Sequence, residues 1–206
     1  MLNSACILCL FLFFSSSTVA AQIIHHEGPD LQKTIDRASS YATILCNRNE
    51  RLTISATILI NKPLTIRDVV AERCERPLEI SNTNQLTLEN VRVIHHSGGQ
   101  PAVHIDNCSN VFTRDFIITG KGNNSAVLIE NTGDIVIDGL TLNKGTESFA
   151  NGLTYLISKD IALTNLRIQN VAAPNAQNAG IVLNNTSQSG TLSSYTITGN
   201  TATVSD

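Results

Sequence analysis

The sequence contains little charge and few aromatic residues. Charged residues make up 15% of its 206 residues, aromatic residues make up 4%, and tryptophan is absent. The formal net charge of -3 provides no basic surface for nucleic acid. The shortage of aromatic side chains also leaves no platform on which bases could stack. Both shortages argue against a nucleic-acid-binding protein.

The apolar run at the N-terminus is too short to span a membrane. It covers residues 7–14 and is followed by small residues up to Ala21. No Lys or Arg precedes the run, but its length and the small residues before Gln22 are typical of a secretory signal peptide. We therefore expect residues 1–21 to be a signal peptide, the mature protein to be secreted, and no membrane span to be present.

Few cysteines remain in the mature chain. Cys6 and Cys9 would leave with the signal peptide, so that Cys46, Cys74 and Cys108 remain. An odd number of cysteines in a secreted protein allows one disulfide and one free thiol. We expect Cys46 to pair with Cys74, because both lie in the N-terminal third of the chain. No Cys-x-x-Cys pair survives, which argues against a zinc site.

The first part of the mature chain is typical of a short amphipathic helix. Asp30 can serve as the N-cap, because it directly precedes the first residue of the apolar pattern. The apolar residues share one helical face through their i, i+4 and i+7 spacing: Leu31, Ile35 and Ala38. A strand run follows at residues 42–46. We therefore expect residues 22–51 to form an N-terminal cap on a domain that covers residues 52–206.

This larger domain repeats a unit of three short strands, which residues 125–142 illustrate. Apolar residues alternate along the strands of this unit: Val127, Ile129, Ile135, Ile137, Leu140 and Leu142. A single unit has nothing against which to bury this apolar face, so copies must stack above and below it. The repeat therefore predicts a solenoid.

The copies align at two corners. Asn recurs at the first corner, with Ile157 in the place between the last two members: Asn61, Asn82, Asn107, Asn131 and Asn185. Asp, Asn or Gly recurs at the second corner: Asp68, Asn90, Asp115, Gly139 and Asn165. These residue types tolerate a left-handed backbone conformation, which explains a one-residue corner. Turn chemistry and a ladder of stacked Asn side chains thus account for the first set without any catalytic role.

A step of about 24 residues, with three strands and no helix in each unit, predicts an all-β fold. Specifically, we expect a right-handed parallel β-helix, or solenoid, of about five to six coils with an N-terminal capping helix. Leucine-rich repeats are excluded because their consensus pattern is missing. An antiparallel sandwich is the alternative, but it would not require residues of the same type at a constant step.

The opening of the chain up to residues 61–66, Asn-Lys-Pro-Leu-Thr-Ile, resembles right-handed β-helix proteins of the pectin-lyase-like superfamily. The resemblance covers nearly all of the mature chain. It implies that a polysaccharide lies along the outer face of the first strand of each coil. It is specific for the fold rather than the activity, because the superfamily contains pectate lyases, polygalacturonases, epimerases, phage tailspikes and non-catalytic surface proteins.

Four ionisable residues are predicted to point outward from the first strands: Glu79, His104, Asp106 and Glu130. Neighbouring strands lie about 4.8 Å apart, so these side chains should form one patch. Carboxylates at that spacing can act as acid and base on a glycosidic bond, or can hold Ca²⁺. His104 beside a carboxylate can transfer a proton near neutral pH. These four residues are the candidate catalytic residues.

A solvent-exposed sheet face with no catalytic role explains the same residues, because outward strand positions are polar in any case. Leu128 and Val182 on the same row argue against a polar sugar groove. The polygalacturonase motifs Asn-Thr-Asp, Asp-Asp and Gly-His-Gly are missing, and the nearest match is Asn-Thr-Gly-Asp at residues 131–134. The sequence therefore leaves open whether the protein is an enzyme of the polysaccharide lyase or glycoside hydrolase type.

Two functions follow from the sequence. The first is a secreted protein that binds or processes an extracellular polysaccharide of the uronate type on its first-strand face. The second is a non-catalytic secreted or surface scaffold, similar to an adhesin or to a truncated member of the superfamily. Residues 195–204 still read as a strand, so we expect another subunit or further coils to cover the C-terminal end. A sequon at Asn107 also allows a glycan beside the candidate face.

Overall fold

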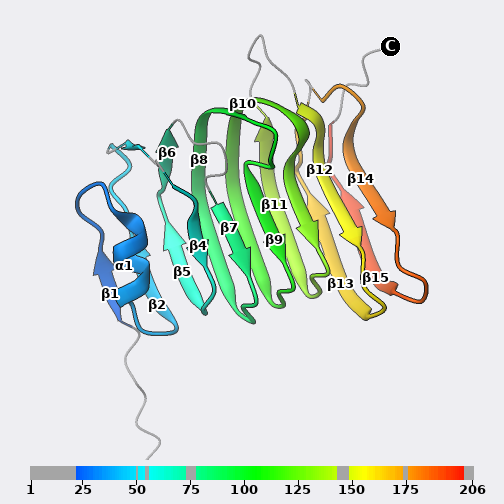
Figure 1. Cartoon of the computed structure of the whole chain (residues 1–206), viewed down its shortest axis with the longest axis horizontal. Coiled ribbons are helices and arrows are strands. Elements are labelled where there is room, and N and C mark those ends of the chain that lie inside the picture. Colours follow the sequence, from blue (N-terminus) through cyan, green and yellow to red (C-terminus); the bar gives the residue numbers. More distant parts are fainter. Residues whose placement is uncertain are drawn as a thin grey trace, which may run out of the picture.

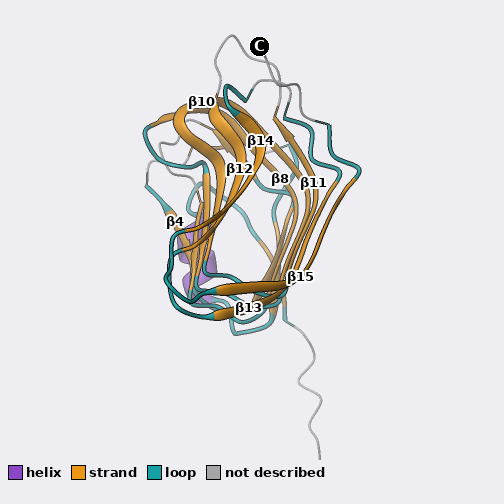
Figure 2. Cartoon of the chain, turned by 90° about the vertical axis from the view of Figure 1, so that its right-hand side faces the viewer, coloured by secondary structure: helices purple, strands orange, loops and turns teal. Residues whose placement is uncertain are grey.

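The chain coils into a parallel β-helix of about five turns (Figure 1). The computed structural model describes residues 22–49, 51–53, 56–72, 78–142, 149–173 and 176–201. Strands account for 61% of the structure, and Figure 2 shows the coils stacked in nearly the same outline when viewed along the axis. The predicted fold class is therefore confirmed. The expected signal peptide at residues 1–21 lies outside the described residues.

The described part of the chain contains one helix and fifteen strands. In chain order these are β1 (Ile23–His25), α1 (Leu31–Arg37), β2 (Ala42–Leu45), β3 (Leu52–Thr53), β4 (Ile58–Ile60), β5 (Leu64–Arg67), β6 (Val70–Glu72), β7 (Leu78–Ser81), β8 (Leu86–Gly98), β9 (Val103–Asp106), β10 (Val111–Glu130), β11 (Ile135–Leu142), β12 (Phe149–Ile157), β13 (Ala162–Gln169), β14 (Ala179–Asn185) and β15 (Thr191–Thr198). No helix among the described residues is long and apolar enough to cross a membrane.

Helix α1 packs at the N-terminal end of the coils (Figure 1). The side chain of Asp30 accepts a hydrogen bond from the backbone N–H of Lys33 at 3.0 Å, which satisfies one of the free amides of the first turn. Leu31 and Ile35 are buried, as their spacing predicts. The short helix and its N-cap are therefore confirmed.

Every strand pair in the described residues is parallel. This pairing excludes the antiparallel sandwich. The first-strand sheet consists of β4, β7, β9, the last part of β10, β12 and β14. The second-strand sheet consists of β2, β5, β8, the first part of β10, β11, β13 and β15. Strand β10 belongs to both sheets because the third strand of one coil continues into the first strand of the next without a break.

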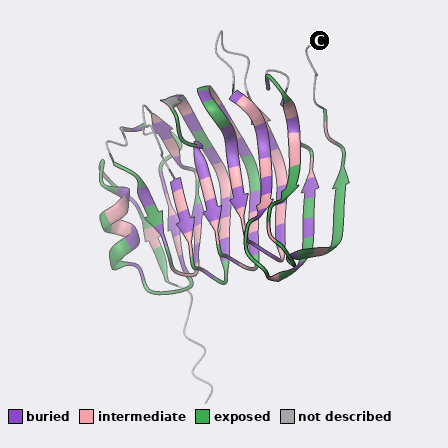
Figure 3. Ribbon diagram, turned by 45° about the vertical axis from the view of Figure 1, so that its right-hand side comes forward, coloured by how far each residue is buried: buried purple, intermediate pink, exposed green. Residues whose placement is uncertain are grey.

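The core fills the inside of the coil. All six apolar residues expected to face inward from residues 125–142 are buried. Figure 3 shows the resulting alternation of buried and partly exposed residues along the strands. The last coil differs, because inward-facing Leu183, Tyr195 and Ile197 are 41%, 60% and 38% exposed. The described residues thus leave part of the apolar face of the last coil uncovered.

The second corner has the left-handed backbone that its residue types predict. The φ angles of Asp68, Asn90, Asp115 and Gly139 are 65°, 54°, 56° and 79°. The prediction that Asn165 follows Gly139 is wrong, because Asp138 pairs with Gln169 and Asn170 comes next. The coil between these corners is longer than the others, so a constant step fails there. Asn165 instead lies within β13, opposite Asp134, where its φ is 56°.

The first corner is left-handed at three of its predicted positions. The φ angles of Asn82, Asn107 and Asn131 are 54°, 52° and 47°. The predicted alignment of Asn61 with Asn82 is wrong by one residue, because Ile60 pairs with Ile80 and Asn61 therefore lies opposite Ser81. Ile157 pairs with Asn185, as the alignment predicts. Exact registers in this fold come from the inward apolar residues rather than from the corner residues alone.

Candidate functional site

The four candidate residues lie on the outer face of the first-strand sheet. Glu79 pairs with His104 across β7 and β9, and Asp106 pairs with Glu130 across β9 and β10. Parallel strands in register place outward positions of successive coils side by side, which is why residues 51 positions apart in sequence (130−79) share one patch. Their side chains are partly buried, between 15% exposed for His104 and 30% for Asp106.

The imidazole of His104 lies between two carboxylates. Its Nδ1 atom is 2.9 Å from Glu79 Oε1, and its Nε2 atom is 3.3 Å from Glu130 Oε2. The Nε2 contact has hydrogen-bond geometry, whereas the direction of the Nδ1 contact suits an ion pair and not a hydrogen bond. A neutral imidazole has one N–H and can donate it to Glu130. When the ring is protonated, its positive charge attracts both carboxylates.

Asp106 belongs to a neighbouring set of contacts. Its Oδ1 atom accepts a hydrogen bond from Asn131 Nδ2 at 3.3 Å, and Lys159 Nζ lies 3.9 Å away. Ser158 links the two sets, because its hydroxyl donates to Glu130 Oε1 at 3.1 Å and accepts a hydrogen bond from Asn131 Nδ2 at 3.0 Å. The structure thus joins all four candidate residues into one polar surface through a loop after β12.

Sequence reasoning missed Ser158 and Lys159. Their backbone N–H groups donate to Asn131 Oδ1 at 2.9 and 3.1 Å, which holds the loop against the preceding coil. The alignment of Ile157 with the Asn corners was the available signal, because it places the next residues beside Asn131. Ser158 and Lys159, the two polar residues after Ile157, could therefore have been predicted as part of the site.

Apolar side chains border the polar surface on both sides. Leu59 pairs with Glu79 and is 39% exposed. On the other side the row continues from His104 through Leu128 and Thr154 to Val182. The predicted position of Leu128 and Val182 on the row is confirmed. The polar surface therefore covers only β7, β9, β10 and the loop after β12, and does not run along the whole sheet.

The residues of this surface do not fit a preformed calcium site. Within the described residues, no three His, Cys, Asp or Glu side chains gather around one point. Glu79 and Glu130 approach different nitrogen atoms of the same ring, so their contacts point toward His104 and not toward a common centre. Calcium needs six to eight oxygen ligands around it, which this arrangement does not offer.

The same geometry limits the acid and base chemistry. In glycoside hydrolases two carboxyl groups flank the scissile bond, with the sugar between them. Here the imidazole of His104 occupies the space between Glu79 and Glu130. The surface can instead accept hydrogen bonds from hydroxyl groups through its carboxylates and can hold a proton at His104. This arrangement favours binding over hydrolysis.

Comparisons with protein-family models, with curated proteins and with solved structures found no match.

Proposed function

We propose that the protein is secreted and binds an extracellular polysaccharide on its first-strand sheet. The observation that supports this most directly is the position of His104 between Glu79 and Glu130 on an exposed face of adjacent strands. The three polar side chains are partly buried and hold one another in place, so they can accept hydroxyl groups without much further loss of rotamer freedom. The resemblance to the pectin-lyase-like superfamily supports the same face.

The class of polysaccharide follows from charge. The resemblance implies a uronate-type chain, which carries a carboxylate on each sugar. The surface itself carries three carboxylates, from Glu79, Asp106 and Glu130, against the imidazole of His104 and the ammonium of Lys159. Like charges at this distance repel. A neutral or sparsely charged chain therefore suits the surface better than a fully ionised uronate, and both belong in the test.

The test is a binding titration of the purified mature protein. Polygalacturonate, alginate and a neutral xylan are titrated by calorimetry, with and without added Ca²⁺, while unsaturated product and reducing ends are followed in parallel. We expect binding without turnover, and a loss of at least tenfold in affinity for His104→Ala and Glu130→Gln.

Glu89→Gln is the matched control, because Glu89 lies on β8 in the second-strand sheet and pairs with Arg67 at 2.7 Å. It should bind like the wild type. Absence of binding to every polysaccharide, or equal binding by the wild type and His104→Ala, would overturn the proposal. Turnover that is lost in His104→Ala would instead make this protein an enzyme.

Secretion has its own test. When the full chain is expressed in a host that recognises secretory signals, we expect the protein in the medium with Gln22 as its N-terminal residue. N-terminal sequencing or intact mass measurement decides this. Retention in the cell with residues 1–21 still attached would contradict it.

One observation favours a second candidate function, a non-catalytic scaffold that binds a protein. The exposed apolar side chains of the last coil suit another subunit or further coils better than water. Light scattering of the mature protein tests this. A stable assembly that Tyr195→Lys disrupts would support the scaffold function, whereas a monomer at all concentrations would argue against another copy as the partner.

A further inference from the structure

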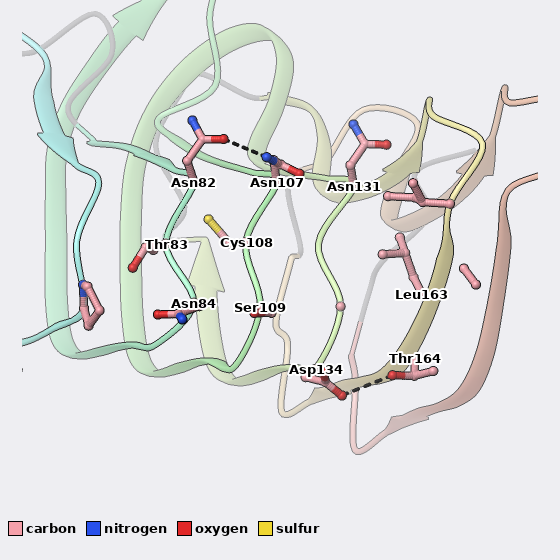
Figure 4. Close-up of a pocket in the computed structure, with 14 residues that line it drawn as sticks. Asn82, Thr83, Asn84, Asn107, Cys108, Ser109, Asn131, Asp134, Leu163 and Thr164 are labelled. Carbon is pink, nitrogen blue, oxygen red and sulfur yellow. Dashed lines mark hydrogen bonds between the residues drawn. The ribbon is translucent and has the colours of Figure 1, made fainter.

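A groove of about 590 Å³ runs along the stacked turns between the first-strand and second-strand sheets (Figure 4). It crosses the coils from Pro63, through the turns around Asn84, Ser109 and Gly133, to the start of β13 at Leu163. Glu79, His104 and Glu130 do not line it. The groove is therefore distinct from the polar surface of the first-strand sheet.

The groove is almost free of formal charge. Asp134 is the one carboxylate among the described residues that line it. Its Oδ1 atom already accepts hydrogen bonds from Asn165 Nδ2 at 2.6 Å and from Thr164 Oγ1 at 3.2 Å. Burial raises the pKa of the Cys108 thiol, which keeps it uncharged near neutral pH. None of the described residues that line the groove is Lys, Arg or His. An anionic ligand would find no cation here.

Unused hydrogen-bonding groups gather at two neighbouring Asn residues. Asn107 Nδ2 donates to Asn82 Oδ1 at 2.6 Å, which is a rung of the predicted Asn ladder. Within the described residues, nothing pairs with the remaining amide atoms, Asn82 Nδ2 and Asn107 Oδ1. These two atoms lie at opposite ends of the hydrogen-bonded pair in Figure 4, so one donor and one acceptor are left at the groove. The hydroxyl of Thr83, buried at the groove wall, also has no partner there.

The predicted rung between Asn107 and Asn131 is absent, and the structure shows why. Asn131 Nδ2 donates to Asp106 Oδ1 and Ser158 Oγ, and its Oδ1 atom accepts from two backbone N–H groups. The polar surface of the first-strand sheet thus uses all of the capacity of Asn131. The free capacity of the ladder is left at Asn82 and Asn107.

The far end of the groove, beyond Asn131 in Figure 4, is lined by apolar side chains. Ile161, Ala162 and Leu163 line it where the chain enters β13. A sugar ring combines the features that such a groove complements, since it has hydroxyl groups at its edge and C–H groups on its faces. One sugar of an oligosaccharide that runs along the groove can accept from Asn82 Nδ2 or donate to Asn107 Oδ1, while a later sugar packs against the apolar side chains at the far end.

We propose that this groove is a second binding site, which takes a neutral, hydroxyl-rich ligand of the class of a neutral oligosaccharide. The site depends on residues that are separate from those of the proposed polysaccharide surface. It holds whether or not the first-strand sheet binds a polysaccharide.

The experiment compares neutral and acidic hexasaccharides. The mature protein is produced without N-glycosylation, so that Asn107 carries no glycan, and is titrated by calorimetry with cellohexaose, maltohexaose and hexagalacturonate. We expect one of the neutral ligands to bind at least tenfold more tightly than hexagalacturonate. Absence of binding by both neutral ligands up to millimolar concentration, or tighter binding of hexagalacturonate, would overturn the proposal.

Two Asn→Gly variants locate the site. Gly adopts a left-handed backbone readily, so Asn82→Gly removes the amide without strain at a residue whose φ is 54°. Asn90→Gly is the matched control, since Asn90 has the same φ of 54° and lies outside the groove. Both variants are made in a His104→Ala background, which weakens the proposed polysaccharide surface, and there we expect at least a tenfold loss of affinity for Asn82→Gly and none for Asn90→Gly. Equal binding with and without Asn82→Gly in this background would contradict the assignment.

A further variant covers the case in which Asn82→Gly does not fold. The side chain of Asn84 is exposed, lines the groove and has no partner among the described residues, so Asn84→Ala should fold like the wild type. Weaker binding of the neutral ligand by Asn84→Ala supports the site, and unchanged binding by this variant contradicts it.

Discussion

The Nδ1 atom of His104 lies 2.9 Å from the Oε1 atom of Glu79 on the neighbouring strand. The pair exists because β7 and β9 are parallel and in register, with both residues at outward positions. The two residues are far apart in sequence, and only the coil length of the solenoid brings them together. A coil one residue longer or shorter would turn one of the two side chains into the core.

The contact between His104 and Glu79 should contribute to stability. We expect a coupling free energy of about 0.5–1 kcal/mol in a double-mutant cycle of His104→Ala and Glu79→Gln, because both side chains are partly shielded from water. Urea unfolding of the four proteins at low ionic strength measures it. A cycle of His104→Ala with Glu89→Gln, which lies on another sheet, should be additive. Additivity in both cycles would show that the His104–Glu79 contact does not contribute to the free energy of unfolding.

Thr83 and Thr132 predict opposite effects for the same substitution. Both side chains are buried at equivalent turns, with the turn of Cys108 between them. Thr132 Oγ1 accepts from the Cys108 N–H at 3.2 Å and donates to the Glu130 carbonyl at 2.8 Å. Thr132→Val should therefore lower the free energy of unfolding by about 1–3 kcal/mol. Thr83→Val removes a buried hydroxyl that has no partner in the described residues, so stability should be unchanged or higher by about 1 kcal/mol.

Chemical denaturation of the two valine variants decides this comparison. A clear loss of stability in Thr83→Val would mean that its hydroxyl has a partner in solution, such as a bound water. Equal effects of the two substitutions would contradict the hydrogen bonding described for Thr132.

Close packing between coils predicts an effect at Gly152. A Cβ atom on Gly152 would overlap the carbonyl oxygen of Gly180 on the next coil and lie 2.8 Å from Ala173 Cβ. Gly152→Ala should therefore destabilise the protein by about 1–3 kcal/mol, or disturb the stacking of β12 on β14. Gly133→Ala is the control, because its added Cβ atom would meet its nearest neighbour, the Thr164 backbone, at 3.5 Å. Thermal unfolding should show a lower midpoint for Gly152→Ala alone.

Several features of the fold could be predicted because they are local. Alternating apolar residues such as Val127 and Ile129 identify the inward face of a strand without reference to any other coil. Left-handed corners at Asp115 and Gly139 follow from residue type in the same way. The outward positions of Glu79 and His104 then follow from alternation, and stacking places them on one face.

Features that depend on the length of a coil could not be predicted. The coil from Gly139 to the next corner, at Asn170, is 31 residues long (170−139), and a constant step therefore selected Asn165. Composition alone does not reveal which coil is longer. The groove was missed for a related reason, since Asn107 Oδ1 is free only because Asn131 bonds to Asp106 and Ser158 instead of Asn107. The predicted disulfide stays a prediction, because Cys74 lies outside the described residues.

The buried hydroxyl of Tyr155 predicts how stability changes at high pH. Burial, with a smaller contribution from the nearby carboxylate of Asp134, raises the pKa of Tyr155 to about 12. The hydroxyl also donates to the Thr132 carbonyl at 2.5 Å, a bond that only the protonated form can make. In the unfolded chain tyrosine titrates near pH 10. The unfolded state therefore releases this proton first as the pH rises.

The sign of the effect follows from the two pKa values. Below about pH 10 both states keep the proton, and the contribution to stability is fully present. Between about pH 10 and 12 the unfolded state binds fewer protons than the folded state. The contribution of Tyr155 to the free energy of unfolding should therefore fall by at most about 1.4 kcal/mol per pH unit.

Urea unfolding of the wild type and Tyr155→Phe at pH 8, 9, 10 and 11 measures this fall. Tyr155→Phe should be about 1 kcal/mol less stable at pH 8, because it lacks the hydrogen bond, and this deficit should shrink as the pH rises. Tyr41→Phe, at a side chain that is 57% exposed, accounts for the general effect of removing a tyrosine hydroxyl. If the deficit of Tyr155→Phe stays constant up to pH 11, the raised pKa of Tyr155 is wrong.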